Sequence, residues 1–329
     1  MDARLRRLLS RWAPDFPDLH FAPAGAGDMG PALETLPADS ESPRLVTPEA
    51  VEGADLEPRP VRSPEPGFAA FLDGIQRSVV IGHAEGVPLV AATVAAVIRR
   101  RVGRRLMTDG RGPAIRRRVY VPRHLVPAAL WDMAEREGYA PCDTGTDGRP
   151  GGDGSAHPTA VQERAYHLVQ QDREQLEQRL AEEWCAAESA PLYIDGGISK
   201  SERVATAACA VGIVKSHRTL YVDAAALSTL ARLEAGQRTT AFRVTSQRRT
   251  PVVSWYLRLR EAAGRGPLWG LVRIEVADAR GDTAAVAARA DTVSRWVLAE
   301  RSPLALPDGR WDRMAYGIRD CETFLRAVV

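Results

Sequence analysis

The stretch that most constrains the fold of this chain is LYIDGGIS at residues 192–199, where an apolar run ends on Asp195 and two glycines follow at once. The stretch AAFLDGIQRS, at residues 69–78, has the same shape around Asp73. Open α/β sheets place their sites at the C-terminal ends of strands, and a glycine after the carboxylate lets a ligand or another segment approach the backbone. Asp-Gly is also among the commonest turn dipeptides. The two stretches are therefore either ordinary strand-to-turn junctions or two halves of one site.

The apolar patterns around these stretches indicate an α/β fold with a mixed sheet flanked by helices. Three successive strands are expected in FAAFLDG, SVVIGHAEG and PLVAATVAAVIRR, followed by a strand in RRRVYVP and a helix at about 127–137. A long helix is expected from Thr159 to Ala187, because apolar residues recur at helical spacing (Leu168, Leu176, Leu180, Trp184). Further strands are expected in PLYIDGG, AACAVGIVKSH, TTAFRV, VVSWYLRLR and LWGLVRIEV, and further helices at 282–300 and 318–329.

The N-terminal part of the chain differs in composition from the rest. Residues 1–14 are basic and amphipathic and predict a short helix, whereas residues 21–67 are rich in Pro, Ala, Gly and acidic residues. The latter composition is typical of an irregular arm or linker. We therefore divide the chain into an N-terminal helix and arm at 1–66 and a main domain at 67–329. Within the main domain, residues 141–158 are almost all turn formers and predict a flexible loop.

Composition excludes several classes of protein. No apolar run approaches the ~20 residues of a membrane span, and no signal-peptide core follows the basic N-terminus, so we expect a cytoplasmic protein without membrane contact. The four cysteines contain no CxxC pair and are expected to be free or buried thiols. The histidines show no HxH or HxxxH pairing, and no phosphate-binding glycine motif lies where its chemistry would require it.

The charge of the chain is nearly balanced, at +2, but its basic residues are clustered at 98–105, 115–123 and 246–250. Such clusters either follow a phosphate backbone or form the solvated faces of arginine-rich elements. Almost every basic residue is arginine, and the only lysines, Lys200 and Lys215, both lie just after the Asp195 stretch. A lysine in such a chain suggests a need for a compact point charge rather than a planar fork.

If Asp73 and Asp195 end adjacent strands, their carboxylates can share a divalent cation. Magnesium and manganese prefer such hard oxygen ligands, and they can activate water and stabilise the leaving oxygen in phosphodiester cleavage. The long helix supplies candidates for a third carboxylate. Glu177 borders the apolar stripe of that helix, and the other acidic candidates lie nearby (Glu174, Glu182, Glu183). The alternative is that this charged helix is simply solvated.

Two later strands carry further candidates. Lys215, in VGIVKSH, follows an apolar strand and would hold a scissile phosphate, or else be a surface lysine at a strand end. LVRIEV alternates cleanly, with apolar residues at 272, 274 and 276. On pattern alone, Arg273 and Glu275 are expected on the solvated face of that strand.

The order of FLDG, a helix with an R-x-x-x-E step, LYIDGGIS, VGIVKSH, WYLRLR, LVRIEV and a final tyrosine-started helix resembles the NurA nuclease domain, from about Phe68 to the C-terminus. The resemblance implies an RNase H-like fold and cleavage of DNA with Mn²⁺ or Mg²⁺. It also implies a homodimer that works with the hexameric HerA translocase in DNA end resection or phage defence.

Carried over by this resemblance, Asp73, Asp195 and Glu177 correspond to metal-binding residues, and Lys215 to the basic residue beyond the second motif. Glu322 stands at the fourth metal position. Three arginines on the later strands are the candidates for contacts with the DNA backbone (Arg243, Arg258, Arg273). The sequence departs from the family pattern at several positions: Ile75 and Gly197 replace serines, and Gly317 replaces a proline. Cys321 and Glu322 stand where the family has an alanine with an aspartate or histidine.

Two other functions are compatible with these residues. The chain could be a catalytically degenerate scaffold that docks onto a translocase ring. It could also be an ATPase of the actin-like or sugar-kinase-like class, in which Asp-Gly-Gly loops cradle phosphates.

Overall fold

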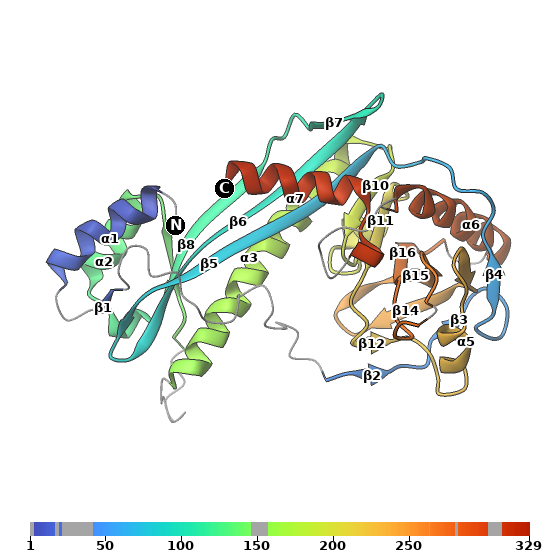
Figure 1. Cartoon of the computed structure of the whole chain (residues 1–329), viewed down its shortest axis with the longest axis horizontal. Coiled ribbons are helices and arrows are strands. Elements are labelled where there is room, and N and C mark those ends of the chain that lie inside the picture. The colour runs from blue at the N-terminus through green and yellow to red at the C-terminus, as the bar shows by residue number, and fades with distance from the viewer. Residues whose placement is uncertain are drawn as a thin grey trace.

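A mixed β-sheet with helices on both faces forms the centre of the molecule (Figure 1). The computed structural model describes residues 3–16, 20–21, 42–145, 157–262, 264–279, 282–301 and 311–329. The central strands are ordered β8-β6-β5-β10-β11. The predicted mixed α/β sheet is therefore confirmed.

The direction of these strands follows the chain in two steps. β5 (Ala70–Ala84), β6 (Val87–Val102) and β8 (Ala114–Val121) form an antiparallel meander. After helix α3 (Pro158–Ala187), β10 (Leu192–Asp195) returns parallel to β5, and β11 (Ala210–Val214) lies parallel to β10. The sheet is therefore antiparallel on one side of β5 and parallel on the other.

Three antiparallel strands continue the sheet beyond β11: β16 (Leu271–Ala277), β15 (Arg249–Arg258) and β14 (Phe242–Ser246). The remaining strands are short: β1 (His20–Phe21), β2 (Arg44–Leu45), β3 (Glu49–Ala50), β4 (Pro58–Pro60), β7 (Arg105–Thr108), β9 (Ala140–Asp143), β12 (Thr219–Leu220) and β13 (Gln237–Thr239). The other helices are α1 (Ala3–Asp15), α2 (Ala128–Arg136), α4 (Glu202–Ala205), α5 (Leu227–Ala231), α6 (Thr283–Glu300) and α7 (Tyr316–Val328), with 3₁₀ turns η2 (Arg123–Leu125) and η3 (Trp311–Arg313).

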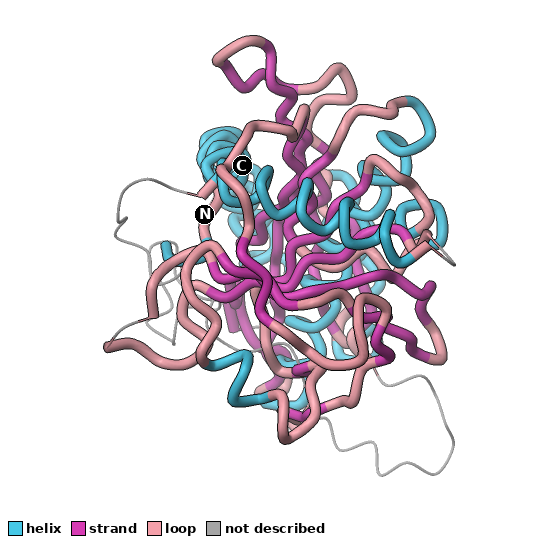
Figure 2. Tube along the Cα trace, turned by 90° about the vertical axis from the view of Figure 1, so that its right-hand side faces the viewer, coloured by secondary structure: helices cyan, strands magenta, loops and turns pink. Residues whose placement is uncertain are grey.

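The two faces of the sheet bury different helices, because successive side chains of a strand point to opposite faces. On β5, Ala70 and Leu72 join the core that includes α3, whereas Phe71 joins the core that includes α6 and α7. Figure 2 shows helices on both sides of the strands. A third core lies where α1 and α2 pack on the far ends of β5, β6 and β8. A residue next to Leu72 on β5 can therefore meet α7, and the one after it can meet α3.

The long helix α3 confirms the predicted one. Proline at its first position suits a helix start, since the fixed φ fits and the missing N–H has no helical partner there. Leu176, Leu180 and Trp184 are buried and Leu168 is partly buried, so the apolar stripe does face the sheet.

The prediction of three strands between residues 68 and 100 is wrong, because the first two are one continuous strand. Residues 75–77 separated the two expected strands, but they pair with β6 along their whole length. Only a register shift near Gly82 interrupts the ladder. A polar segment can remain in a strand when its neighbour is a long partner of matched length.

The described part of the N-terminal arm is more ordered than its composition predicts. β3 pairs with β14, β4 pairs with β13, and β2 forms a separate two-stranded sheet with β12. Residues 22–41 of the arm and 146–156 of the predicted flexible loop lie outside the described residues. The start of that loop is β9, which runs parallel to β8. All four cysteines are free thiols, and no helix in the described part of the chain is long and apolar enough to cross a membrane.

Helix α7 packs directly against β5 at Gly317. A Cβ atom at this position would lie 2.3 Å from the ring of Phe71, which is fully buried. Such overpacking costs about 1–3 kcal/mol, and the better helix propensity of alanine returns at most about 1 kcal/mol. We therefore expect Gly317→Ala to lower the free energy of unfolding in a denaturant titration by about 1–2 kcal/mol. Gly110→Ala is the control, since its Cβ would enter open space; equal losses in both variants would contradict this packing.

Candidate functional site

Asp73 and Asp195 lie at the same level of two adjacent parallel strands. Leu72 of β5 is paired with Ile194 of β10, and the two aspartates are the next residues of their strands. Asp195 ends its strand as predicted. Asp73 does not, because β5 continues beyond it with β6 as its neighbour, and Asp73 itself is paired with Val97. It marks instead the point where the pairing of β5 with β10 stops.

The glycine after Asp73 makes room for a third carboxylate. Gly74 faces α3, and a Cβ atom there would lie only 2.4 Å from Oε1 of Glu177. The carboxylate of Glu177 therefore occupies the space that any other residue at position 74 would fill. Arg173, one turn earlier in α3, donates a hydrogen bond to the same oxygen at 2.5 Å. The structure thus places Glu177, the candidate from the long helix, beside Gly74.

Burial and neighbouring charge act together on Asp73, whose side chain is 5% exposed. Burial raises the pKa of this carboxyl well above its usual range, and the charges of Asp195, Glu177 and Glu322 add to the effect against the opposing charge of Lys215. Oδ1 accepts a hydrogen bond from the N–H of Gly74 at 2.8 Å. Oδ2 is buried and has no hydrogen-bond partner among the described residues. A buried acceptor without a partner is costly, so Asp73 is the least satisfied group of the site.

Burial also raises the pKa of Glu177, although the guanidinium of Arg173 opposes the shift. Glu322 comes from α7 on the other face of the sheet and is largely buried. It forms an ion pair with Arg326 at 3.8 Å. The neighbouring thiol of Cys321 donates to the carbonyl of Phe71 at 3.4 Å, which ties this part of α7 to β5. Carboxylates from three elements besides β5 thus act on Asp73.

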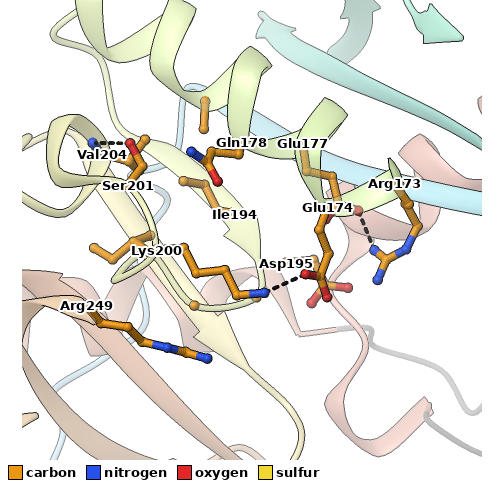
Figure 3. A pocket seen from close by; sticks show the side chains of 14 residues that line it. Arg173, Glu174, Glu177, Gln178, Ile194, Asp195, Lys200, Ser201, Val204 and Arg249 are labelled. Atoms are coloured by element: carbon orange, nitrogen blue, oxygen red, sulfur yellow. Dashed lines mark hydrogen bonds and ion pairs between the residues drawn. The ribbon is translucent and has the colours of Figure 1, made fainter. Parts of the chain in front are cut away.

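Both lysines of the chain neutralise carboxylates at this site. Nζ of Lys215 lies 2.8 Å from the carboxylate of Asp195. Nζ of Lys200 lies 2.5 Å from Oε2 of Glu174, a residue of α3 that lines the same cavity as Asp195. A cavity of about 180 Å³ opens between α3 and the two glycines after Asp195. Figure 3 shows Arg173, Lys200 and Arg249 around the acidic side chains of this cavity.

The second glycine of the Asp195 stretch allows the approach of a carboxylate that the sequence analysis did not place in the site. A Cβ atom at Gly197 would lie 3.0 Å from Oε2 of Glu275. The same oxygen accepts a hydrogen bond from the N–H of Ile198 at 2.8 Å. Glu275 therefore fixes the backbone of the loop that follows Asp195. A serine at position 197, as in the family pattern, would have to fit against this carboxylate.

The expectation that Arg273 and Glu275 lie on a solvated face is wrong, since they are 8% and 2% exposed. Arg273 donates to Glu275 at 2.6 Å and to the hydroxyl of Ser254 at 3.1 Å. Its guanidinium also lies over the ring of Tyr221. β16 has neighbours on both sides and is covered on both faces, so alternation in its sequence separates an apolar face from a buried polar one.

The three arginines predicted to bind DNA are all engaged within the protein. Arg258 is fully buried and donates to four backbone carbonyls, so it has no exposed group to offer to DNA. Arg273 is held by Glu275 as described above. Arg243 is half-buried between Asp278, at 2.8 Å, and Glu49. Arg249, which is exposed at the mouth of the cavity, has no ion pair with any described residue.

The donor set of the site suits a hard divalent cation. Its groups are carboxylate oxygens, which magnesium and manganese prefer, and Oδ2 of Asp73 is a buried acceptor with its lone pairs unused. The cations of Lys215 and Arg173 now pair with two of these carboxylates. Within the described ranges, no three acidic, histidine or cysteine side chains already surround an ion position. Binding of a cation would require Asp195 or Glu177 to exchange its present partner.

No protein-family model matches this chain, and no curated protein matches it. Among solved structures, the chain is similar to the NurA nuclease from Sulfolobus solfataricus, known from a crystal structure. The two are 12% identical, the alignment covers 80% of each chain, and the TM-score is 0.42. The geometry of the site therefore has to carry the inference about function.

Proposed function

We propose that this protein is a metal-dependent nuclease that hydrolyses phosphodiester bonds of DNA. The observation that carries the proposal is the buried carboxylate of Asp73, whose Oδ2 has no partner among the described residues and which lies in the field of three other carboxylates. An arrangement so unfavourable by itself is stabilised when a divalent cation binds. Asp73, Asp195 and Glu177 would hold that cation, with Glu322 as a further candidate from α7.

Such an ion, when bound, supplies an activated water at neutral pH and positive charge for the leaving oxygen. The chain's own cations supply the rest. Lys215 and Arg173 each already contact a carboxylate of the cluster. Both would therefore be placed to orient a phosphate once those carboxylates bind the metal ion instead. Lys200 and Arg249 line the mouth of the cavity and would hold the strand on either side. Charge-assisted bonds from such groups position a phosphate firmly.

The two rival functions account less well for these features. A pure scaffold has no need for a buried unpartnered carboxylate, and strain of this kind persists at sites where it serves a mechanism. An ATPase would require a cavity for a nucleoside triphosphate beside the two glycines. The cavity there, of about 180 Å³, is smaller than the roughly 300–1,000 Å³ of typical small-molecule sites.

Four parts of this proposal rest on the sequence resemblance to the NurA domain. They are DNA as the substrate, manganese or magnesium as the metal, a HerA-type ATPase as the partner, and a homodimer as the oligomeric state. The roles in end resection or phage defence and the cytoplasmic location rest on sequence alone and stay predictions. Co-purification of the chain with a hexameric translocase would support the partnership, and a stable monomer at micromolar concentration would contradict the dimer.

Removal of the charge of Glu177 tests the proposed activity. We expect the wild-type protein to cut end-labelled linear DNA, double- or single-stranded, in the presence of Mn²⁺ or Mg²⁺. EDTA should abolish this cleavage. Glu177→Gln should lower the initial rate by about a hundredfold, because one charged ligand is lost while its shape is kept. Glu183→Gln, an exposed position on the same helix, is the matched control. Cleavage that persists in EDTA, or equal rates in both variants, would overturn the assignment.

A further inference from the structure

A second cavity lies on the other side of Lys215 from the acidic cluster. Its volume is about 650 Å³, within the range of roughly 300–1,000 Å³ that small-molecule sites occupy. It opens to solvent and is lined by residues 215–218 after β11, by residues 266–269 before β16, and by Asp312 and Arg313 before α7. Lys215 lines this cavity while its Nζ contacts Asp195. The cavity therefore adjoins the proposed active site, with the side chain of Lys215 between them.

The lining of this cavity is positively charged. Lys215, Arg218 and Arg313 contribute cations, and among the lining residues that the structure describes Asp312 is the one carboxylate. Asp312 is 1% exposed. Its Oδ2 accepts from the N–H of Gly270 at 2.7 Å and lies 3.3 Å from Nε of Arg313. Arg313 also donates to the backbone carbonyl of Lys215 at 2.5 Å, which fixes the wall of the cavity. Guanidinium and ammonium groups gathered in one place suit an anionic ligand, and a phosphate above all.

The cavity also offers groups that a bare phosphate does not use. His217 lines it, and burial lowers the pKa of its imidazole to about 4, so the ring is neutral at physiological pH. Nε2 lies 2.9 Å from the carbonyl of Leu271 and must carry the proton to bond it. Nδ1 is therefore an acceptor, and it is buried without a partner among the described residues. Pro267, Leu268 and Trp269 add an apolar wall.

We propose that this cavity binds one nucleotide of the DNA strand next to the bond that is cut, with its phosphate on Arg218 and Arg313 and its base against Trp269. The acceptor of His217 is available to an N–H or O–H group of the base or sugar. Stacking on an aromatic ring contributes about 1–3 kcal/mol per base and tolerates any sequence. The proposal rests on the proposed nuclease function and adds a place for the strand beside the acidic cluster. Lys215 would then contact the phosphate between the two positions.

A binding experiment without cleavage tests this subsite. Full-length protein is titrated in EDTA with a fluorescently labelled single-stranded 12-mer (a length of about one site), and gel analysis confirms that the strand stays intact. We expect Arg218→Ala to weaken binding at least about tenfold, and Trp269→Ala by a similar factor. Arg232→Ala, an exposed arginine on the edge of α5, is the matched control and should bind like wild type. Thermal midpoints of all variants confirm that they fold.

Competition then distinguishes the possible ligands. A deoxynucleoside monophosphate should displace the labelled strand from wild type at least about tenfold more effectively than inorganic phosphate does, because it also fills the apolar wall. Equal competition by the two would overturn the nucleotide assignment in favour of a simple anion site. Unchanged binding of the strand by Arg218→Ala and Trp269→Ala would overturn the subsite itself. Absence of cleavage by wild type in metal would instead contradict the proposed function and is a separate readout.

Discussion

Replacement of Asp73 by asparagine is expected to abolish metal-dependent cleavage and, at the same time, to stabilise the metal-free protein. The loss of rate should be at least about a thousandfold, because the residue that would hold the ion becomes a neutral amide. The fold should survive, since asparagine has the same shape and its oxygen can still accept the bond from Gly74 that Oδ1 accepts now. Its amide group would face carboxylates and could donate to them.

The gain in stability follows from the raised pKa of Asp73. Because the folded-state pKa lies above that of the unfolded chain, the native state binds more protons than the unfolded state between those two values. Stability therefore falls as the pH rises through that window, and at neutral pH the native state carries the cost of an ionised, buried carboxylate. Asparagine removes the cost at every pH. The unfolding midpoint of the wild type in EDTA should thus decline from mildly acidic to neutral pH more steeply than that of Asp73→Asn.

Two measurements on the same pair of proteins check this prediction. Initial cleavage rates in Mn²⁺ report the loss of activity, and thermal midpoints in EDTA at several pH values report the gain in stability. Addition of Mn²⁺ should raise the midpoint of the wild type and leave that of Asp73→Asn nearly unchanged, since ligand binding stabilises only a protein that binds. Asp132→Asn, an exposed residue on α2, is the control and should match wild type in every assay. A variant that is less stable than wild type in EDTA would show that the charge of Asp73 is satisfied.

Opposing demands of stability and activity explain why the site could be located from sequence. A buried carboxylate at the end of an apolar strand destabilises the fold unless a ligand or another charged group binds it. A glycine after the carboxylate leaves room for such a group. The structure gives two of the three glycines a reason: Gly74 admits the carboxylate of Glu177, and Gly197 admits that of Glu275. Glu177 lies on the helix before Asp195 and Lys215 directly after the strand that follows it, and this order could be read along the chain. Local sequence therefore predicted the residues that face one another across β5 and β10.

Other residues of the site depend on which faces of the sheet are covered, and local sequence does not contain that information. Glu275 alternates with valine and isoleucine as an exposed residue would, but the loop after Asp195 and the side chain of Arg273 cover it. The segment after Gly74 is polar and does not predict a strand by itself. Its pairing with β6, which is distant information for a local pattern, keeps it extended. Arginine has the same ambiguity. A guanidinium that binds phosphate and one that binds carbonyl groups within the fold look alike in sequence, and burial alone separates Arg258 from Arg249.

Arg258 is expected to be one of the most sensitive positions for stability. Its guanidinium donates to the carbonyls of Leu230 at 3.1 Å, Leu233 at 3.0 Å and Pro267 at 2.8 Å, and to that of Trp269. Arg258→Ala would leave four acceptors without their donor, and for the two in fully buried contacts, Leu230 and Leu233, each loss costs about 1–3 kcal/mol. It would also leave the space of a large side chain empty. We expect the free energy of unfolding to fall by about 4 kcal/mol or more, a large part of the roughly 5–15 kcal/mol that holds a domain together.

Denaturant unfolding of three variants measures this effect. Arg258→Lys keeps a charge and three donors but not the planar fork, so its loss should fall between those of the wild type and Arg258→Ala, and it serves where the alanine variant does not fold. Arg105→Ala, an exposed arginine on β7, should change stability by less than about 0.5 kcal/mol. The same four carbonyls belong to the end of α5 and to the loop that carries Trp269. Arg258→Lys should therefore also weaken the binding of the single-stranded 12-mer, and unchanged stability with unchanged binding would show that these carbonyls find other donors.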